Sequence, residues 1–194
     1  MAQFFSLHAE QPQARLIKQA AQIMRDGGLV ASPTDSAYAL GGHTGDNPLL
    51  ARIRRIRGVD ERHHFTLLCR DLSEIATYAR VDNSQYRLLK ATTPGPYTFI
   101  LEGTKELPRR VLHPKRKSIG LRIPDHPVVS ALLAELGEPL LSSTLLLPDD
   151  MVLPDRQHGG DASAGGRGSV VGELVQRDGV HAVPHARRRR AVRE

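Results

Sequence analysis

The stretch at residues 28–41 constrains this chain most. It begins with an apolar run, which ends abruptly in a proline and three small polar side chains. Pro33 lacks a backbone donor and has a fixed φ, so we expect a buried strand to end there. Thr34, Asp35 and Ser36 would then project from the turn at the carboxyl end of that strand, the edge where open α/β sheets bind ligands. The alternative is a turn in which these side chains only stabilise the local backbone.

The composition fits one basic globular domain. The chain has 194 residues, a formal net charge of +6 and a pI near 9.9. This length allows a single domain with a sizeable core. The charge favours polyanionic partners such as RNA or nucleotide phosphates, the alternative being a basic surface that only keeps the protein soluble.

The cysteine content and the start of the chain indicate in which cellular compartment the protein is expected. Cys69 is the one cysteine, so a disulfide framework is excluded, and no Cys/His cluster has the spacing of a structural zinc site. No stretch is long and apolar enough to cross a membrane, and the first residues lack the basic start and apolar core of a signal peptide. We therefore expect a cytoplasmic protein without a membrane partner or a structural metal.

Hydrophobic periodicity predicts strands that alternate with helices, which is typical of an α/β fold. A polar loop is expected at 42–47, and weak strands at 169–175 and 179–183. The expected strands are 3–7, 29–31, 65–69, 97–101, 118–123 and 140–147, and the expected helices are 11–25, 47–57, 73–78, 83–90 and 126–136.

Several stretches in order along the chain carry a resemblance to a known family. They are Ser-Pro-Thr-Asp-Ser-Ala-Tyr-Ala-Leu-Gly at 32–41, Arg55-Ile56-Arg57, and the segments 94–101, 118–124 and 137–144. This pattern resembles the YrdC family, whose best-known members are threonylcarbamoyl-AMP synthases. The details of 65–73 and 97–106 are most similar to the YciO branch of that family. The resemblance implies a twisted sheet of mixed parallel and antiparallel strands, flanked by helices, with a concave basic face.

The resemblance covers a predicted YrdC-like domain at 1–148 that lacks its usual closing segment. Residues 151–194 contain eight Arg, no Lys and seven Gly, and all aromatic residues precede them. We therefore expect an Arg/Gly-rich tail at 149–194 that is poorly ordered or results from a shifted reading frame. The alternative is a genuine basic extension that contacts RNA.

The resemblance implies a pocket for an amino-acid substrate around Arg122. From the residues alone, an Arg at a strand end is either an exposed charge or an anion clamp. The family pattern favours a clamp for the substrate carboxylate, with hydroxyl groups supplied by Thr34, Ser36 and Thr144. Ser118 is added because it precedes Arg122 by four residues, on the same face of the expected strand.

A second set of basic residues is predicted to bind phosphate. Arg55 and Arg57 match a Lys-x-Arg pair that contacts ATP in the synthases, and His64 is expected near the nucleotide. Without the resemblance, such a cluster is usually a solvated basic face. The loop residues Lys115, Arg116 and Lys117 are candidates for RNA contacts, with an ordinary solvated loop as the alternative.

The resemblance implies a YciO-type protein that binds ATP, with Mg2+ carried by the nucleotide. Double-stranded RNA or tRNA is a further expected partner. The implied activity is that of an L-threonylcarbamoyladenylate synthase acting on L-threonine and bicarbonate in tRNA modification, and no residue is assigned a catalytic role. Two departures weaken it: Leu146 stands where the synthases have Asn, and Cys69 where they have His. The alternatives are a non-catalytic binder of double-stranded RNA or ribosomal RNA precursors, and an inert truncated product.

Overall fold

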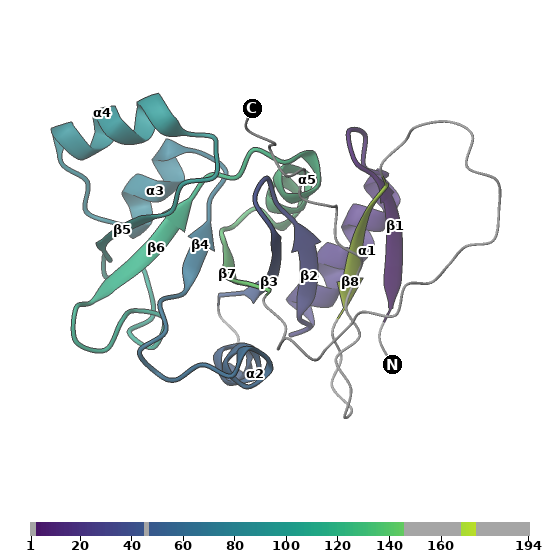
Figure 1. Cartoon of the computed structure of the whole chain (residues 1–194), viewed down its shortest axis with the longest axis horizontal. Coiled ribbons are helices and arrows are strands. Elements are labelled where there is room, and N and C mark those ends of the chain that lie inside the picture. The colour runs from purple at the N-terminus through teal and green to yellow at the C-terminus, as the bar shows by residue number, and fades with distance from the viewer. Residues whose placement is uncertain (1–2, 45–46, 146–167, 174–194) are drawn as a thin grey trace, which may run out of the picture.

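The computed structural model describes residues 3–44, 47–145 and 168–173, and within them the strands form one eight-stranded sheet (Figure 1). The strand order is β1-β8-β2-β3-β7-β4-β6-β5. All neighbours pair antiparallel except β4 and β6, which are parallel. The strands are β1 (Phe4–His8), β2 (Val30–Pro33), β3 (Tyr38–His43), β4 (Thr66–Leu68), β5 (Phe99–Glu102), β6 (Ser118–Arg122), β7 (Leu140–Thr144) and β8 (Gly168–Glu173). The predicted mixed α/β sheet is confirmed.

Five helices in the described part of the chain flank the sheet, and most have clear start or stop signals. They are α1 (Ala14–Arg25), α2 (Asn47–Arg57), α3 (Leu72–Tyr78), α4 (Asn83–Thr92) and α5 (Pro127–Leu136). Asp82 caps α4 in a reciprocal capping box with Gln85, which satisfies backbone donors at the first turn. His126 caps α5, and Gly137 ends it in the left-handed conformation at φ 76°.

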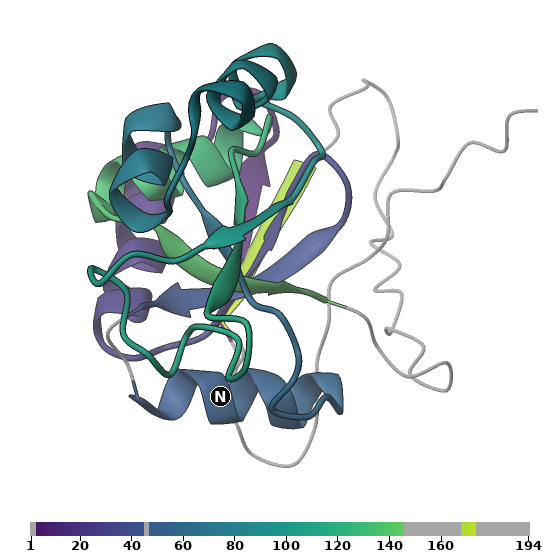
Figure 2. The same cartoon turned by 90° about the vertical axis from the view of Figure 1, so that its left-hand side faces the viewer.

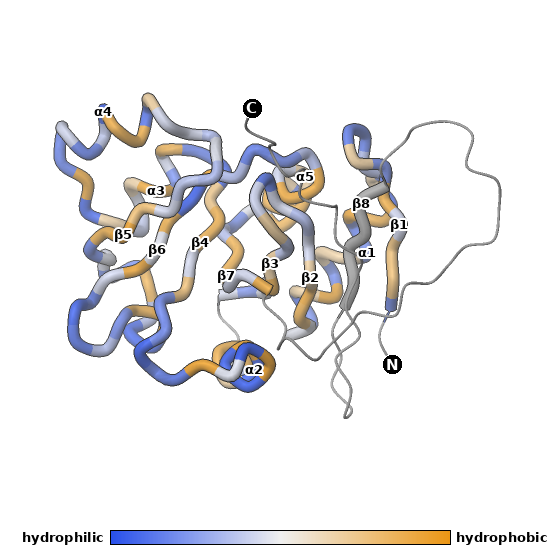
Figure 3. Tube along the Cα trace, in the orientation of Figure 1, coloured by the Kyte–Doolittle hydropathy of each residue, from blue (hydrophilic) through white to orange (hydrophobic). Residues whose placement is uncertain are grey.

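Both faces of the sheet are covered, because consecutive strand residues point to opposite sides. In β4, Leu67 belongs to a buried cluster that also contains residues of α2, α3 and α4, whereas Leu68 packs with α1 and α5. Helices α1 and α5 lie against each other on one side, and α2 runs along one end of the sheet (Figures 1 and 2). Hydrophilic and hydrophobic residues are interspersed along α2, as expected for a helix with one buried face (Figure 3).

The prediction of a polar loop at 42–47 places the start of the loop too early, because β3 continues to His43. Residues 34–37 connect β2 to β3 as a tight hairpin, with Val30 opposite Gly41 in the ladder. The sequence of β3 contains Ala and two Gly and no β-branched residue, so it does not have the composition typical of a strand. Gly42 is needed for close packing, since a Cβ there would lie 2.6 Å from Leu49 Cδ1 and 3.2 Å from the Gly28 carbonyl oxygen.

The weak strand predicted at 169–175 corresponds to β8, which lies antiparallel between β1 and β2. The first strand, helix and second strand therefore form a crossover whose two parallel strands are separated by β8 rather than paired directly. The second weak strand, at 179–183, and most of the predicted tail lie outside the described residues.

Adjacent leucines in α4 allow a matched test of this packing. Leu89 is 1% exposed within the core, whereas Leu88 is 54% exposed. Leu89→Ala should lower the free energy of unfolding by about 2–5 kcal/mol, because it removes buried atoms and leaves a cavity. Leu88→Ala deletes the same atoms from a solvated position and should cost less than about 1 kcal/mol. Denaturant titration of both variants measures the difference, and equal losses would contradict the assigned orientation of α4.

Candidate functional site

The turn between β2 and β3 is held by its own threonine. The Thr34 amide donates to the Ala37 carbonyl over 3.0 Å, and Thr34 Oγ1 accepts from the amides of Ser36 and Ala37 over 3.3 and 3.2 Å. This is the local stabilisation expected of a Ser/Thr turn. The same hydrogen bonds hold Asp35 and Ser36 at the tip of the hairpin, beside the end of β6.

Arg122, the last residue of β6, has a protein partner on each guanidinium nitrogen. Nη1 donates to Ser36 Oγ over 2.9 Å, Nε donates to the Gly95 carbonyl over 3.3 Å, and Nη2 forms an ion pair with Asp35 Oδ1. The side chains of Arg122 and Asp35 are only 11% and 12% exposed. A buried charge is tolerated only when it is paired and hydrogen-bonded, and this network meets that requirement.

A small cavity of about 30 Å³ adjoins Arg122 and is rich in hydroxyl groups. Of the five residues predicted to bind an amino acid, the structure brings together Thr34, Ser36, Arg122 and Thr144 around it. Ser118 does not line this cavity, because it begins β6 and lies about 13 Å from Arg122 along the strand. The other lining residues are Ala37, Tyr38, Ala39, Thr66, Leu68, Thr98 and Ser142.

A second cluster joins the end of α2 to β7. Ser143 Oγ lies 2.9 Å from His63 Nε2 and accepts a hydrogen bond of 3.3 Å from Arg57 Nε. Arg54 lies on the same side of the helix, with its guanidinium carbon 5.4 Å from the centre of the Phe65 ring. Arg55 is exposed and does not share that side. Of the two predicted arginines of the phosphate set, only Arg57 lies in this cluster.

His64 belongs to a third group, at the basic loop. Its ring stacks on that of His113, with centroids 4.4 Å apart. His113 Nδ1 accepts from the amides of Lys115 and Arg116, so it also organises the loop. The side chains of Lys115, Arg116 and Lys117 are exposed. The structure therefore groups His64 with the predicted RNA-contact residues rather than with Arg57.

The first two clusters lie on opposite faces of β7. Ser142 lines the cavity beside Arg122, whereas its neighbour Ser143 contacts Arg57 and His63. Consecutive strand side chains point to opposite sides, so a ligand that touches both clusters has to pass the end of β7. Thr144, the last residue of that strand, lines the cavity at this end.

Burial and neighbouring positive charge lower the pKa of two of these histidines, His63 and His64. The pKa of His63 is lowered first by burial and then by the charge of Arg57. The pKa of His64 is lowered by burial and by His113 and Arg116. Burial raises the pKa of the Cys69 thiol far above its ordinary value, so this residue is a core side chain and not a thiolate nucleophile.

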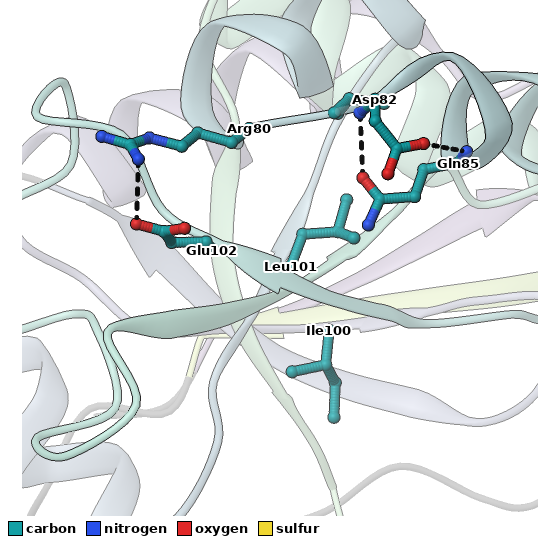
Figure 4. Close-up of a pocket in the computed structure, with 7 residues that line it drawn as sticks. Arg80, Asp82, Gln85, Ile100, Leu101 and Glu102 are labelled. Carbon is teal, nitrogen blue, oxygen red and sulfur yellow. Dashed lines mark hydrogen bonds and ion pairs between the residues drawn. The ribbon is translucent and has the colours of Figure 1, made fainter.

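A larger surface hollow of about 420 Å³ lies elsewhere, between the start of α4 and the edge strand β5 (Figure 4). Arg80 and Glu102 form an exposed ion pair of 3.3 Å there, and Asp82 is engaged in capping α4. No predicted site residue lines this hollow. Its charged pair is exposed to solvent and therefore weakly interacting, unlike the buried pair of Arg122 and Asp35.

The sequence interpretation missed two residues, His63 and Ser143. His63 and His64 are adjacent in the sequence, but His63 contacts Ser143 whereas His64 stacks on His113. Strand alternation across the pair Ser142 and Ser143 is the signal that could have separated their roles. Leu146, whose departure from the synthase pattern was noted, lies outside the described residues.

Within the described residues, no group of three or more His, Cys, Asp or Glu is arranged to hold a metal ion. Among the helices of that same part of the chain, none has the length and apolar character needed to span a bilayer.

The mixed sheet with flanking helices defines an α/β protein, and comparison with known proteins identifies its family. Residues 22–165 match the Sua5/YciO/YrdC family model, described as "Telomere recombination". The chain belongs to this family. "Uncharacterized protein YciO" of Escherichia coli (strain K12) is 57% identical over 148 residues, covering 76% of this chain and 72% of that protein. The crystal structure of E. coli YciO superposes with a TM-score of 0.75 over 77% of this chain and 72% of that chain.

More distant relatives include enzymes. A protein of Halorhodospira halophila named threonylcarbamoyl-AMP synthase is 30% identical over 129 residues, covering 66% of this chain and 67% of that protein. The structure of P. abyssi Sua5 complexed with L-threonine is 24% identical and has a TM-score of 0.64 over 69% of this chain and 39% of that chain. That last likeness shows the fold alone.

The lowered pKa of His63 predicts a pH dependence of stability. Below about pH 6.5, the ordinary pKa of histidine, the unfolded chain binds a proton that the folded protein excludes. The free energy of unfolding should therefore fall as the pH drops from 6.5 through the lower folded pKa, and this contribution should be constant above 6.5.

His63→Gln removes the titrating group but keeps a side chain able to bond Ser143, so it should flatten this dependence. Ser143→Ala is the control, because it removes the hydrogen bond and leaves the imidazole. Denaturant titrations between pH 5 and pH 8, with His63 followed by NMR, make the measurement. A His63→Gln variant that loses stability on acidification as steeply as the wild type would contradict the assignment.

Proposed function

We propose that this chain binds L-threonine and ATP and carries out chemistry of the threonylcarbamoyl-adenylate type. One observation carries the proposal: Arg122 lies among the hydroxyls of Thr34, Ser36 and Thr144 beside a small cavity. A guanidinium can hold a carboxylate through two parallel hydrogen bonds, and hydroxyls can orient the remaining polar groups of an amino acid. The synthase relatives at about 30% identity support this choice of substrate.

The proposed reaction balances without a redox step. The threonine amine attacks carbon dioxide or bicarbonate and becomes a carbamate, with loss of a proton or of water. A carbamate oxygen then attacks the α-phosphorus of ATP, and the bond to the bridging oxygen breaks so that pyrophosphate leaves. The protein's task is to position two anions and to balance the phosphate charge. Mg2+ would arrive with the nucleotide, bound mainly by its phosphate oxygens.

The positions of the two clusters suggest how the substrates would lie. Arg122 would hold the amino acid on one face of β7, while Arg57 and His63 would face the phosphates on the other. The reacting carbamate and α-phosphorus would then meet at the end of the strand, beside Thr144. Ser143 orients both Arg57 and His63, so it would act as a positioning residue for the nucleotide.

Replacing Arg122 tests the proposed amino-acid site. Arg122→Ala should weaken L-threonine binding by roughly tenfold to hundredfold, because it removes charge-assisted hydrogen bonds worth roughly 1.5–3 kcal/mol. Arg122→Lys should recover only part of the affinity, since an ammonium cannot form the planar fork. Isothermal titration with L-threonine in the presence of MgATP and bicarbonate measures both variants.

Arg80→Ala is the matched control, because Arg80 is an exposed arginine paired with Glu102 on the far side of β5. Circular dichroism has to show that each variant is folded, since Arg122→Ala leaves Asp35 without its partner. Threonine affinity that is the same in the wild type and in folded Arg122→Ala would remove Arg122 from the site and end this proposal.

A second function, binding of double-stranded RNA, is favoured by the exposed basic loop. Lys115, Arg116 and Lys117 follow His113, which anchors the loop through its ring nitrogen. A variant with all three changed to Ala should bind duplex RNA more weakly, and its dependence of log affinity on log salt should be shallower by about two to three. A triple variant at the exposed Arg15, Lys18 and Lys90 changes the net charge equally and should keep the wild-type slope.

Filter binding at several salt concentrations, with and without MgATP and threonine, distinguishes the two functions. Salt-dependent binding that ignores both small molecules favours the RNA binder. No difference in slope between the two triple variants would exclude the loop as the RNA contact.

A further inference from the structure

The ion pair between Arg122 and Asp35 leaves the proposed amino-acid site with no net charge. Asp35 Oδ1 contacts Nη2 of Arg122, and both side chains are almost entirely shielded from solvent, at 12% and 11% exposed. Oppositely charged groups this close largely cancel each other's field at a third group. A carboxylate that entered the cavity would therefore meet an arginine that is already neutralised.

The guanidinium is also occupied geometrically. Of its five N–H donors, three are used, one each by Gly95, Ser36 and Asp35. A carboxylate clamp needs two parallel donors on one edge, and Asp35 and Ser36 hold one donor each on the two terminal nitrogens. The adjoining cavity is small, at about 30 Å³, and Ser36 and Arg122 both line it.

Asp35 itself is held by few contacts. Its second carboxylate oxygen, Oδ2, is buried and has no hydrogen-bond partner. The residue lies in the 34–37 turn, where the backbone hydrogen bonds are made by Thr34 and Ala37 and not by Asp35. Its side chain can therefore leave Arg122 without breaking the β2–β3 ladder, and a departing carboxylate would regain hydration for the unpaired oxygen.

We propose that Asp35 is a resident carboxylate that occupies Arg122 until the carboxylate of a ligand displaces it. Asp35 thus lowers the affinity of the site for every carboxylate. Only a ligand whose carboxylate displaces Asp35 from Arg122 binds there. This inference rests on the proposed function for the identity of the natural ligand, the amino-acid carboxylate, but the competition itself extends to any small carboxylate.

Asp35→Asn tests the inference, because the amide keeps the shape and one oxygen acceptor for Arg122 but removes the charge. The variant should bind L-threonine and acetate at least about tenfold more tightly than the wild type, since the ligand no longer competes with an anion. L-Threoninol, which lacks the carboxylate, should gain nothing. Asp125→Asn is the matched control: Asp125 is an exposed carboxyl near the start of α5 and does not contact Arg122.

Isothermal titration gives the affinities, and chemical shifts of the Arg122 guanidinium report whether the ligand reaches that group. Tighter binding of acetate together with threonine supports both proposals. Tighter binding of acetate without any threonine binding supports the role of Asp35 and contradicts the proposed function. If Asp35→Asn proves unfolded, Asp35→Ser serves in its place. A folded variant that binds acetate no better than Asp125→Asn, or more weakly than the wild type, overturns the inference.

Discussion

The site depends on one requirement, that the buried guanidinium of Arg122 must find partners inside the protein. An isolated buried charge would cost several kcal/mol, so each nitrogen has to be compensated. The three partners come from segments far apart in sequence: the 34–37 turn supplies Asp35 and Ser36, and the segment before β5 supplies the Gly95 carbonyl. The network therefore ties the hairpin of β2 and β3 to β6 and the loop that precedes β5, across β7 and β4, which lie between them in the sheet. Removing Arg122 would leave the carboxylate of Asp35 buried and unpaired, so stability and ligand binding are coupled at this residue.

Strand alternation is the second constraint, and it gives neighbouring residues of β7 different contacts. Ser142 faces the Arg122 cavity and Ser143 faces Arg57 and His63, so one residue of register divides the proposed amino-acid face from the proposed phosphate face. Both faces of β7 are buried against core clusters along most of its length, which pins that register. The arrangement leaves the end of the strand, at Thr144, as the place where groups from the two faces can approach each other.

The sequence allowed the fold class and most elements to be predicted, because caps, glycines and hydrophobic periodicity act locally. The helix at 126–136 begins and ends close to where His126, Pro127 and Gly137 indicate. The strand β3 was missed because Tyr-Ala-Leu-Gly-Gly-His lacks the β-branched residues of a typical strand, and its glycines are explained only by the close approach of α2 and β7. Motif matching brought Thr34, Ser36, Arg122 and Thr144 together correctly in space, although their binding roles remain predictions. The pairing of Arg122 with Asp35 and of His63 with Ser143 depends on segments about 80 residues apart, and no local pattern encodes such contacts.

The chemistry around Arg122 also bears on which ligands the proposed site would select. A hydroxyl-lined cavity beside a neutral ion pair binds anions less readily than an uncompensated arginine would, and this lowers the affinity for every carboxylate by a similar factor. The basic residues of α2 and of the loop after His113 would raise the local concentration of polyanions, and this would offset the loss for ligands that carry phosphate. Such a site would then prefer ligands that present a carboxylate and a phosphate at the same time. One molecule could carry both groups, or two reacting molecules could carry one each. That coupling arises from the position of the two clusters on either side of β7, and it would change with any substitution that frees Arg122 or removes the charge of Arg57.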